Sequence, residues 1–391
     1  MEPTSRQACG LREVAGAFLK IGALSYGGPA ILGIMQSEIQ EKRRWLSKEA
    51  FLEGLALVNM LPGPPAAQLS IYIGHACHGW RGGVIAGLCF MLPAFLILMS
   101  LTWLYTAYGN LGAARDVFYG IGPVVLAIFA VAVWRLGRVV MKSAAQILIA
   151  VASAGLLAYA PIGIAPVLLL AGCAGVALYH SRAWGSAIAA AILVAMALSH
   201  IVYSPAGEAA AASAGPPGPW QLALFFMKVG AFTFGGGITI LAFIQEQVVN
   251  QFHWLTAQEF IDGLALGQLT PGPILMLAAY VGYRLAGFAG AVVSACAIFF
   301  PAFVLMLSIV PMLKRLRELL WLKAAMKGIT SAVIGVLAVS LARLLPHAAP
   351  DAFTAVVFGL TIAAMMLWRL SPLPLMVGGS IAGVIARVRP L

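Results

Sequence analysis

The sequence predicts an all-α polytopic membrane protein built from two inverted homologous repeats. Three observations lead to this fold class. The 391-residue chain is 62% hydrophobic and only 9% charged, whereas soluble proteins carry about 25% charged residues. One sequence pattern occurs twice, near the N-terminus and again after the middle. Glycine and proline interrupt both copies, so we expect broken or re-entrant helices that meet near the membrane midplane.

The duplicated pattern has two parts. The first part reads FLKIGALSYGGP over 18–29 and FMKVGAFTFGGG over 226–237. The second part reads FLEGLALVNMLPGP over 51–64 and FIDGLALGQLTPGP over 260–273. Such breaks leave backbone N–H and C=O groups without helical partners, and lipid cannot satisfy them. Paired interrupted segments in two repeats are typical of a transporter binding site.

The remaining apolar stretches predict ordinary spanning helices. We expect an N-terminal repeat over 1–203, a linker over 204–219 that is rich in Pro, Ala and Gly, and a C-terminal repeat over 220–391. The predicted spans are 82–108, 116–138, 143–160, 162–180 and 184–203 in the first repeat, and 287–313, 322–345, 351–369 and 372–388 in the second.

Four further segments, 15–38, 50–78, 220–247 and 258–283, carry the breaks near their centres. Each arm holds about a dozen residues, or about 18 Å of helix, which is roughly half of a 30 Å hydrocarbon core. Each segment is therefore either a re-entrant hairpin whose tip stops near the midplane or a full crossing with a kink.

The distribution of Lys and Arg favours hairpins. With hairpins, the basic clusters at 42–48, 135–142 and 314–323 all fall on the cytoplasmic side, and the Lys/Arg-free stretch 246–259 falls outside. Full crossings would place two of these clusters outside. The hairpin topology also puts five crossings between the copies, and an odd number inverts the second copy. Inverted repeats can support alternating access around a central site.

The breaks are candidate anion-binding groups. Glycine runs at Gly27–Pro29 and Gly235–Gly237 can expose N–H groups that form an anion nest. Proline favours the first turn of a helix, so Pro62–Pro64 and Pro271–Pro273 each end one short helix and start another, whose positive dipole end faces the break. Close packing at a hairpin tip, or a plain kink, is the alternative role.

Lys20 and Lys228 match across the copies. An intramembrane lysine is costly and marks a functional site, although snorkelling to the interface is the alternative. Polar side chains just before the second break could donate to an oxyanion. The candidate substrate-binding residues are Lys20, Gly27, Gly28, Asn59, Pro62, Gly63, Pro64, Lys228, Gly235, Gly236, Gln268, Thr270, Pro271, Gly272 and Pro273.

Two pairs of carboxylates also match across the copies, Glu38 with Glu246 and Glu53 with Asp262. They are candidates for proton coupling, which needs a carboxyl pKa raised by partial burial, or for pairing with the lysines. Helix capping or placement at the interface is the alternative.

The sequence predicts no metal site, no cofactor and no enzymatic activity. His75, Cys77 and His78 have no fourth ligand nearby, and Tyr283 stands opposite His75 in the second copy. The five cysteines form no C-x-x-C pair. The net charge of +11 fits basic cytoplasmic loops and anionic lipid headgroups, so we expect the bilayer, and no nucleic acid, as a partner.

At the two interrupted motifs the chain resembles the chromate ion transporter (CHR) family of the long, two-domain type. The resemblance rests on Gly27–Pro29, on Pro62–Pro64, on their second-half counterparts and on the duplication, and it covers nearly the whole chain. One departure is that Gly237 stands where the first copy has Pro29. The resemblance implies efflux of chromate across the bacterial inner membrane and chromate resistance.

The sequence thus predicts a multi-pass inner-membrane protein that exports a tetrahedral dianion, either chromate or a sulfate-like oxyanion. A dianion leaving a cell gains about 4.6 kcal/mol per 100 mV, from about 2.3 per charge. Membrane potential or proton exchange therefore suffices as a driving force, and no Walker-type loop is present. The alternatives are a carrier for sulfate or another oxyanion, a passive anion channel and, more remotely, a membrane-embedded reductase. A homodimer is kept as a candidate assembly.

Overall fold

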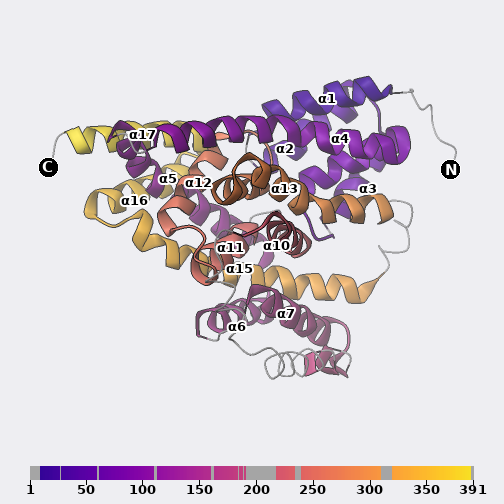
Figure 1. Cartoon of the computed structure of the whole chain (residues 1–391). Helices are drawn as coiled ribbons and strands as arrows, with labels where there is room; N and C mark the ends of the chain where they lie inside the picture. Colours follow the sequence, from indigo (N-terminus) through magenta and orange to yellow (C-terminus); the bar gives the residue numbers. More distant parts are fainter. Residues whose placement is uncertain are drawn as a thin grey trace. The chain divides into compact units, whose positions relative to one another are not determined.

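The computed structural model describes residues 9–26, 28–59, 61–109, 112–159, 163–183, 185–187, 189–190, 217–233, 239–309 and 319–388. Within these residues every regular element is a helix (Figure 1), which confirms the predicted all-α class. The long apolar helices, each able to cross a membrane by length and composition, are α4 (Pro65–Tyr108), α5 (Gly112–Val140), α13 (Leu277–Ile309) and α15 (Leu320–Ala348).

The shorter apolar helices agree with the predicted spans to within a few residues. They are α6 (Ala144–Tyr159), α7 (Ile164–Tyr179), α16 (Ala352–Leu367) and α17 (Pro372–Val388). A 16-residue helix is about 24 Å long, slightly shorter than a hydrocarbon core of about 30 Å. The predicted span at 184–203 and the linker lie largely outside the described residues.

Short helices carry the duplicated motifs. In the first copy they are α1 (Leu11–Leu24), α2 (Gly28–Met35), the π-helix η1 (Gln36–Lys42) and α3 (Lys48–Val58). In the second copy they are α10 (Pro219–Ala231), α11 (Thr239–Ile244), the π-helix η2 (Gln245–Gln251), α12 (Ala257–Leu269) and the 3-10 helix η3 (Ile274–Met276). The second break of each copy, at Pro62–Pro64 and Pro271–Pro273, therefore lies in a described part of the chain, whereas the glycine run Gly235–Gly237 lies outside the described residues.

The chain forms two compact units, and each unit contains segments of both sequence repeats. The first unit comprises 1–111, 218–240 and 263–317. The second unit comprises 112–217, 241–262 and 318–391. The two halves of the sequence are thus interleaved, and the boundaries of the two repeats stay a prediction.

In the first unit, each copy packs its first motif helix on its own long helix. Helix α1 packs on α4, α10 packs on α13, and α4 contacts α13. Gly22 lies directly against the backbone of Phe90, and its counterpart Gly230 lies in the same way against Ile298. Missing side chains at these matched glycines allow the helices to approach closely.

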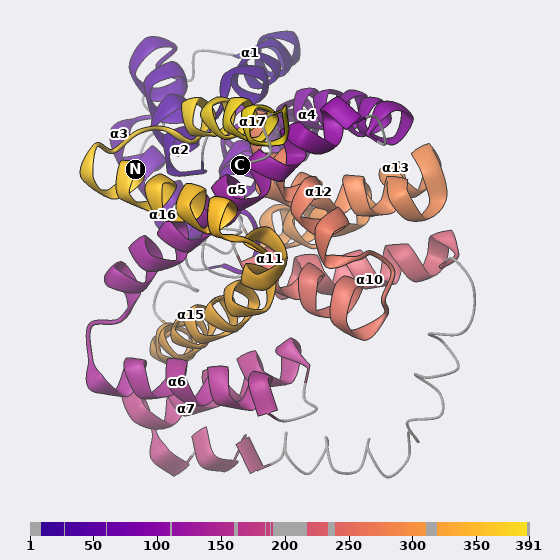
Figure 2. The same ribbon diagram turned by 90° about the vertical axis from the view of Figure 1, so that its left-hand side faces the viewer.

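In the second unit, the long helix of each half of the sequence packs on short helices of the other half. Helix α5 packs with α16 and α17, whereas α15 packs with α6 and α7 (Figure 2). Gly120 on α5 lies against the backbone of Gly379 on α17, and Gly328 on α15 lies against Ala171 on α7. Both contacts join matched positions, so small residues again set helix packing.

The second break of each copy is the tip of a helical hairpin. The Tyr72 hydroxyl on α4 donates to the Ala50 carbonyl at the start of α3, at 3.1 Å, and the same ring lies against Gly54. In the second copy, Gly263 lies against the ring of Tyr280. Since these pairs flank the tips, the chain reverses direction there. With 11 residues, α3 is only about 16 Å long and too short to cross a membrane by itself.

A second reversal follows each hairpin. His78 and Gly79 inside α4, like Ala286 and Gly287 inside α13, leave helical geometry, and the two glycines have φ of 58° and 62°. Gly74 then lies against the backbone of Gly82. A straight helix would place these two residues about 12 Å apart. The short arm of α4 therefore folds back on its spanning part, as separate segments at 50–78 and 82–108 predict.

Candidate functional site

Two Pro-Gly-Pro tips form the centre of the candidate site in the first unit. Gly63 has φ of 126° and Gly272 has φ of 112°, values that residues with a Cβ rarely adopt. The prolines that follow have φ of −76° at Pro64 and −75° at Pro273, and each caps the next helix. Glycine makes the turn possible and proline starts the new helix.

The tips are cross-bonded between the two copies. The Gly63 N–H donates to the Thr233 carbonyl at 2.6 Å, and the Gly272 N–H donates to the Ser25 carbonyl at 2.7 Å. Ser25 and Thr233 are buried and occupy the same position in their motifs, just before the glycine runs. Reciprocal contacts of this kind are what a two-fold relation between two copies produces. The two interrupted parts of the motif therefore meet, each with the part from the other copy.

Each tip lies against one of two matched alanines on the long helices. A Cβ at Gly63 would lie 3.6 Å from Ala302 and would overlap the Gln68 amide, and one at Gly272 would lie 2.6 Å from Ala94. The tips thus sit against long helices, on which Ala94 and Ala302 hold equivalent positions. No side chain fits at either glycine without displacing a neighbour.

The two tips differ in polarity. The buried Gln68 amide donates to the Pro62 carbonyl at 2.6 Å, whereas the second copy has only apolar residues, Leu275–Ala279, at that place. The Gln68 amide oxygen and the Ser25 hydroxyl are buried and have no hydrogen-bond partner within the described residues. Buried polar atoms normally bond to protein or water; the Ser25 hydroxyl can donate or accept, whereas the Gln68 amide oxygen can only accept.

The backbone N–H groups of the tips already donate hydrogen bonds within the protein. Because the N–H groups of Gly63 and Gly272 donate to carbonyls, they cannot bind an anion in this conformation. Helix α2 begins at Gly28, so the N–H groups of its first turn lack partners in the helix and its positive dipole end lies at the first break. Gly27 and Gly235–Gly237 lie outside the described residues.

The polar residues just before the second breaks are engaged locally. The exposed Asn59 side chain donates to the Leu55 carbonyl at 2.8 Å, and the buried Thr270 hydroxyl donates to the Leu266 carbonyl at 2.8 Å. Gln268 is half-buried. A direct role of these residues toward substrate stays a prediction.

Glu38 forms ion pairs with three basic residues of the first copy. Its buried carboxylate lies 3.5 Å from Lys20 and Lys42 and 3.2 Å from Arg43. Glu38 lies outside the candidate spans. Burial acts to raise the pKa of this carboxyl, but the hydrogen bond from Arg43 and the lysine charges outweigh burial, so the pKa lies below the usual glutamate value. Proton coupling through Glu38 would require these cations to move away first.

Glu246 has a different partner in the second copy. Arg343 on α15 forms an ion pair with its carboxylate, and Asn250 donates to the same group at 2.9 Å. Arg343 also donates to the Leu157 carbonyl at 3.1 Å. Its counterpart Arg135 donates to the matched carbonyl of Met365, also at 3.1 Å. Sequence reasoning missed both arginines as site residues, although their equivalent positions in the repeat are the signal that would have found them.

The other matched charges do not share an environment. Lys228 is exposed, like Lys20. Glu53 is exposed, whereas Asp262 is buried and accepts from Gln258 at 3.0 Å. The structure thus separates the members of the second carboxylate pair by burial, and their proposed coupling role stays a prediction.

These features define a class. Within the described residues the molecule is an all-helical membrane protein with two interleaved copies of one motif. The broken segments of one copy bond to those of the other, an arrangement typical of secondary transporters. The chain belongs to the chromate transporter family, since the sequence profile of that family, described as "Chromate transporter", matches it twice, over 12–178 and 220–384. Family membership and the apolar helices also support the predicted multi-pass location in the bacterial inner membrane.

Curated relatives match nearly the whole chain. The "Chromate transport protein" of Cupriavidus metallidurans is 32% identical over 379 residues, which cover 96% of this chain and 93% of the relative. The "Probable chromate transport protein" of Synechococcus elongatus is 34% identical over 397 residues, covering 97% and 96%. The "Chromate transport protein" of Pseudomonas aeruginosa is 31% identical over 363 residues, covering 90% and 86%. No solved structure is a significant match to the chain.

Proposed function

We propose that the protein exports chromate from the cell as a secondary transporter and thereby confers chromate resistance. The observation that supports this most strongly is the reciprocal bonding of the tips, Gly63 to Thr233 and Gly272 to Ser25. Two equivalent joints between the copies can open alternately, which is how paired repeats give alternating access. This proposal takes the repeats to be inverted in the membrane, as the loop charges predict.

Binding is assigned to the first unit, where the tips meet. Helix α2 supplies a positive N-terminus, and Ser25 supplies a buried hydroxyl that has no partner within the described residues and can donate to an anion. Lys20 and Lys228 would neutralise a dianion. Movement outward follows the membrane potential, which favours export by about 4.6 kcal/mol per 100 mV for two charges.

Chromate uptake into inverted membrane vesicles tests direction and energy coupling. We expect uptake to rise when the vesicle interior is made positive, because uptake there corresponds to export from the cell. An imposed proton gradient should change the rate only if protons exchange. Variants Glu38→Gln, Glu53→Gln, Glu246→Gln and Asp262→Asn then show which carboxylate couples.

Three outcomes would replace this proposal. Sulfate uptake that is faster than chromate uptake, with effective mutual competition, would make the protein a sulfate carrier. Flux that follows only the concentration gradient and shows no saturation would make it a channel. Formation of chromium(III) by the purified protein would make it a reductase.

Lys20→Ala tests the role of the matched lysines. We expect chromate affinity to fall by about tenfold, which corresponds to one lost charge-assisted contact of about 1.4 kcal/mol. Stability should barely change, because the Lys20 side chain is 56% exposed and Lys42 and Arg43 still neutralise Glu38. Equilibrium chromate binding to purified protein is the measurement. Lys48→Ala is the control, since Lys48 has Ala257 as its counterpart; equal affinities in both variants would exclude the lysine from the site.

A further inference from the structure

Two matched clusters of side chains lie at helix ends in the second unit. In the first cluster, Lys327 near the start of α15 lies over the ring of Tyr179 at the end of α7, with Nζ 4.9 Å from the ring centroid. The Tyr179 hydroxyl is 3.0 Å from the hydroxyl of Ser143, which directly precedes α6. The cluster therefore joins neighbouring ends of α6, α7 and α15, three helices that pack on one another (Figure 2).

The second cluster has the same geometry with the residue types exchanged. Arg387 at the end of α17 lies over the ring of Tyr119 near the start of α5, with Cζ 4.7 Å from the ring centroid. The Tyr119 hydroxyl donates to the carboxylate of Asp351, the N-cap of α16. Each cluster thus holds a cation, a tyrosine and a polar residue that precedes a short helix. The repeat matches Tyr119 with Lys327, Asp351 with Ser143 and Arg387 with Tyr179.

Positive and negative charges balance in the second cluster. Arg387 forms an ion pair with Asp116 at 3.7 Å, and Arg115 is the neighbour of Asp116 in the sequence. Burial acts to raise the pKa of the Asp351 carboxyl, but its hydrogen bonds, led by that from the Thr354 N–H, outweigh burial, so the pKa lies below the usual aspartate value. Asp351 is therefore ionised at neutral pH, and two carboxylates accompany two arginines.

The first cluster carries positive charge that no carboxylate balances. Lys142 precedes Ser143, and Lys323 lies one turn before Lys327 on α15. The positions that match the two carboxylates of the second cluster hold Ser143 and Ala324. Within the described residues none of the three lysines forms an ion pair. We call Lys142, Lys323 and Lys327 the lysine cluster.

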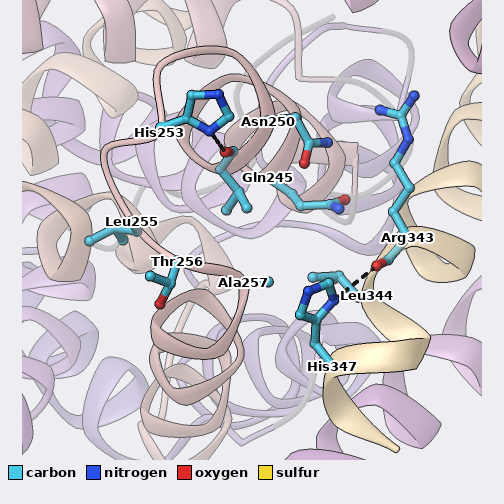
Figure 3. Close-up of a pocket in the computed structure, with 10 residues that line it drawn as sticks. Gln245, Asn250, His253, Leu255, Thr256, Ala257, Arg343, Leu344 and His347 are labelled. Atoms are coloured by element: carbon cyan, nitrogen blue, oxygen red, sulfur yellow. Dashed lines mark hydrogen bonds between the residues drawn. The ribbon is translucent and has the colours of Figure 1, made fainter. Parts of the chain in front are cut away.

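The other end of α15 has no such excess of charge. A cavity of ≈ 310 Å³ lies there, between η2, the start of α12 and the end of α15 (Figure 3). Among the described residues that line it, Arg343 is the one with a permanent positive charge, and it forms an ion pair with Glu246. The unbalanced positive charge of α15 therefore lies at its start.

Exposed apolar side chains surround the lysine cluster. Leu320 and Trp321 precede Lys323 on α15 and are 65% and 49% exposed. Leu178 on α7 and Leu148 on α6 are 55% and 69% exposed. On a membrane helix such side chains contact acyl chains, and tryptophan is enriched at the level of the headgroups. Cations next to apolar surface fit an amphiphilic anion better than a soluble one, which has no apolar part to place there.

We propose that the lysine cluster is a binding site for the phosphate headgroup of an anionic phospholipid such as phosphatidylglycerol. The cluster lies at the ends of apolar helices, where the headgroup layer begins, and long lysine side chains extend toward that layer. Each lysine near an anionic headgroup contributes about fivefold in affinity. A bound lipid holds the ends of α6, α7 and α15 together, so it stabilises the second unit. This site does not depend on the proposed transport function.

Native mass spectrometry of the purified full-length protein in detergent, titrated with phosphatidylglycerol or phosphatidylcholine, tests the site. We expect the first phosphatidylglycerol to bind at least about tenfold more tightly than phosphatidylcholine. The variant K323Q/K327Q should lose this preference, whereas K323R/K327R should keep it, because the charge is retained. The matched control R115Q/R387Q removes two cations from the second cluster and should keep the preference as well.

A gain of binding provides a test that does not depend on loss of a site. D116A/D351S gives the second cluster the uncharged residue types of the first, and serine still caps α16. Its two arginines then lack carboxylate partners in the cluster, so we expect a second phosphatidylglycerol to bind in preference to phosphatidylcholine. A variant that gains no second lipid would contradict the role of net charge and overturn the proposal.

Three further results would overturn the lipid site. The first is equal affinity of the parent protein for the two lipids. The second is an equal loss in K323Q/K327Q and R115Q/R387Q, because binding would then depend only on the total charge of the protein. The third is displacement of phosphatidylglycerol by inorganic phosphate at constant ionic strength, which would assign the lysine cluster to a soluble anion.

Discussion

Replacing Gly63 with alanine is expected to reduce chromate transport by at least about tenfold while the protein still reaches the membrane. The φ of 126° at this position costs a residue with a Cβ about 1–3 kcal/mol, and the new methyl group would overlap the Gln68 amide. Relief of both costs displaces the tip and breaks its bond to Thr233. A loss of about 1.4 kcal/mol in the transport barrier is tenfold in rate.

Chromate uptake by inverted vesicles, normalised to the amount of inserted protein, is the measurement. Gly272→Ala should have a comparable effect, because it has φ of 112° and meets Ala94. Gly267→Ala is the matched control: this glycine lies on α12 with nothing within 4 Å of a built Cβ. Near-parental uptake by Gly63→Ala would show that the tip is not part of the transport path.

Among substitutions of the matched charged residues, Arg343→Ala is expected to cause the largest loss of stability. Removing one partner of a buried ion pair costs about 3–5 kcal/mol. The Arg343 side chain is 33% exposed and that of Glu246 is 11% exposed, so we expect about 3 kcal/mol, the lower end. The variant also loses the bond from Arg343 to the Leu157 carbonyl, which joins α15 to α6.

The apparent unfolding midpoint of the purified protein in detergent measures this effect, which should amount to several degrees. Lys20→Ala is the control, because its exposed ion pair with Glu38 is worth about 0–1 kcal/mol. The double variant Glu246→Ala/Arg343→Ala should lose less than the sum of the single variants, since it leaves no unpaired buried charge. Equal midpoints for Arg343→Ala and Lys20→Ala would contradict the structural role of the pair.

The candidate site could be predicted only in part. Gly63 and Gly272 are recognisable in the sequence because glycine between two prolines cannot continue a helix. The acceptors of their N–H groups could not be predicted, because Ser25 and Thr233 contribute backbone carbonyls, which every residue type has. Gln68 was missed for another reason: it has no counterpart in the second copy, so the repeat gives no signal.

Matched charges were found from the sequence, but only some of their partners were: the Lys20–Glu38 ion pair was among the predicted alternatives, whereas Arg343 was not. The sequence matches Glu38 with Glu246, but Glu38 is the third residue of η1 and Glu246 the second residue of η2. Glu38 binds Lys20, Lys42 and Arg43, and Glu246 binds Arg343. Lys42 and Arg43 lie four and five positions after Glu38, whereas Lys20 and Arg343 come from other helices. Local spacing therefore predicts the contacts of Lys42 and Arg43 and not those of Lys20 and Arg343.

The sequence by itself determined the membrane class, the duplication, the helical spans and the places where helices break. These depend on local chemistry: apolar length, and the inability of glycine and proline to sustain a helix. Only the tertiary structure decided that the halves interleave, so that α5 packs with α16 and α17 and α15 packs with α6 and α7. The same holds for the crossed bonds at the tips. Two similar copies offer each other nearly the same surfaces, and which copy a helix packs against depends on the sum of distant contacts, which no local pattern records.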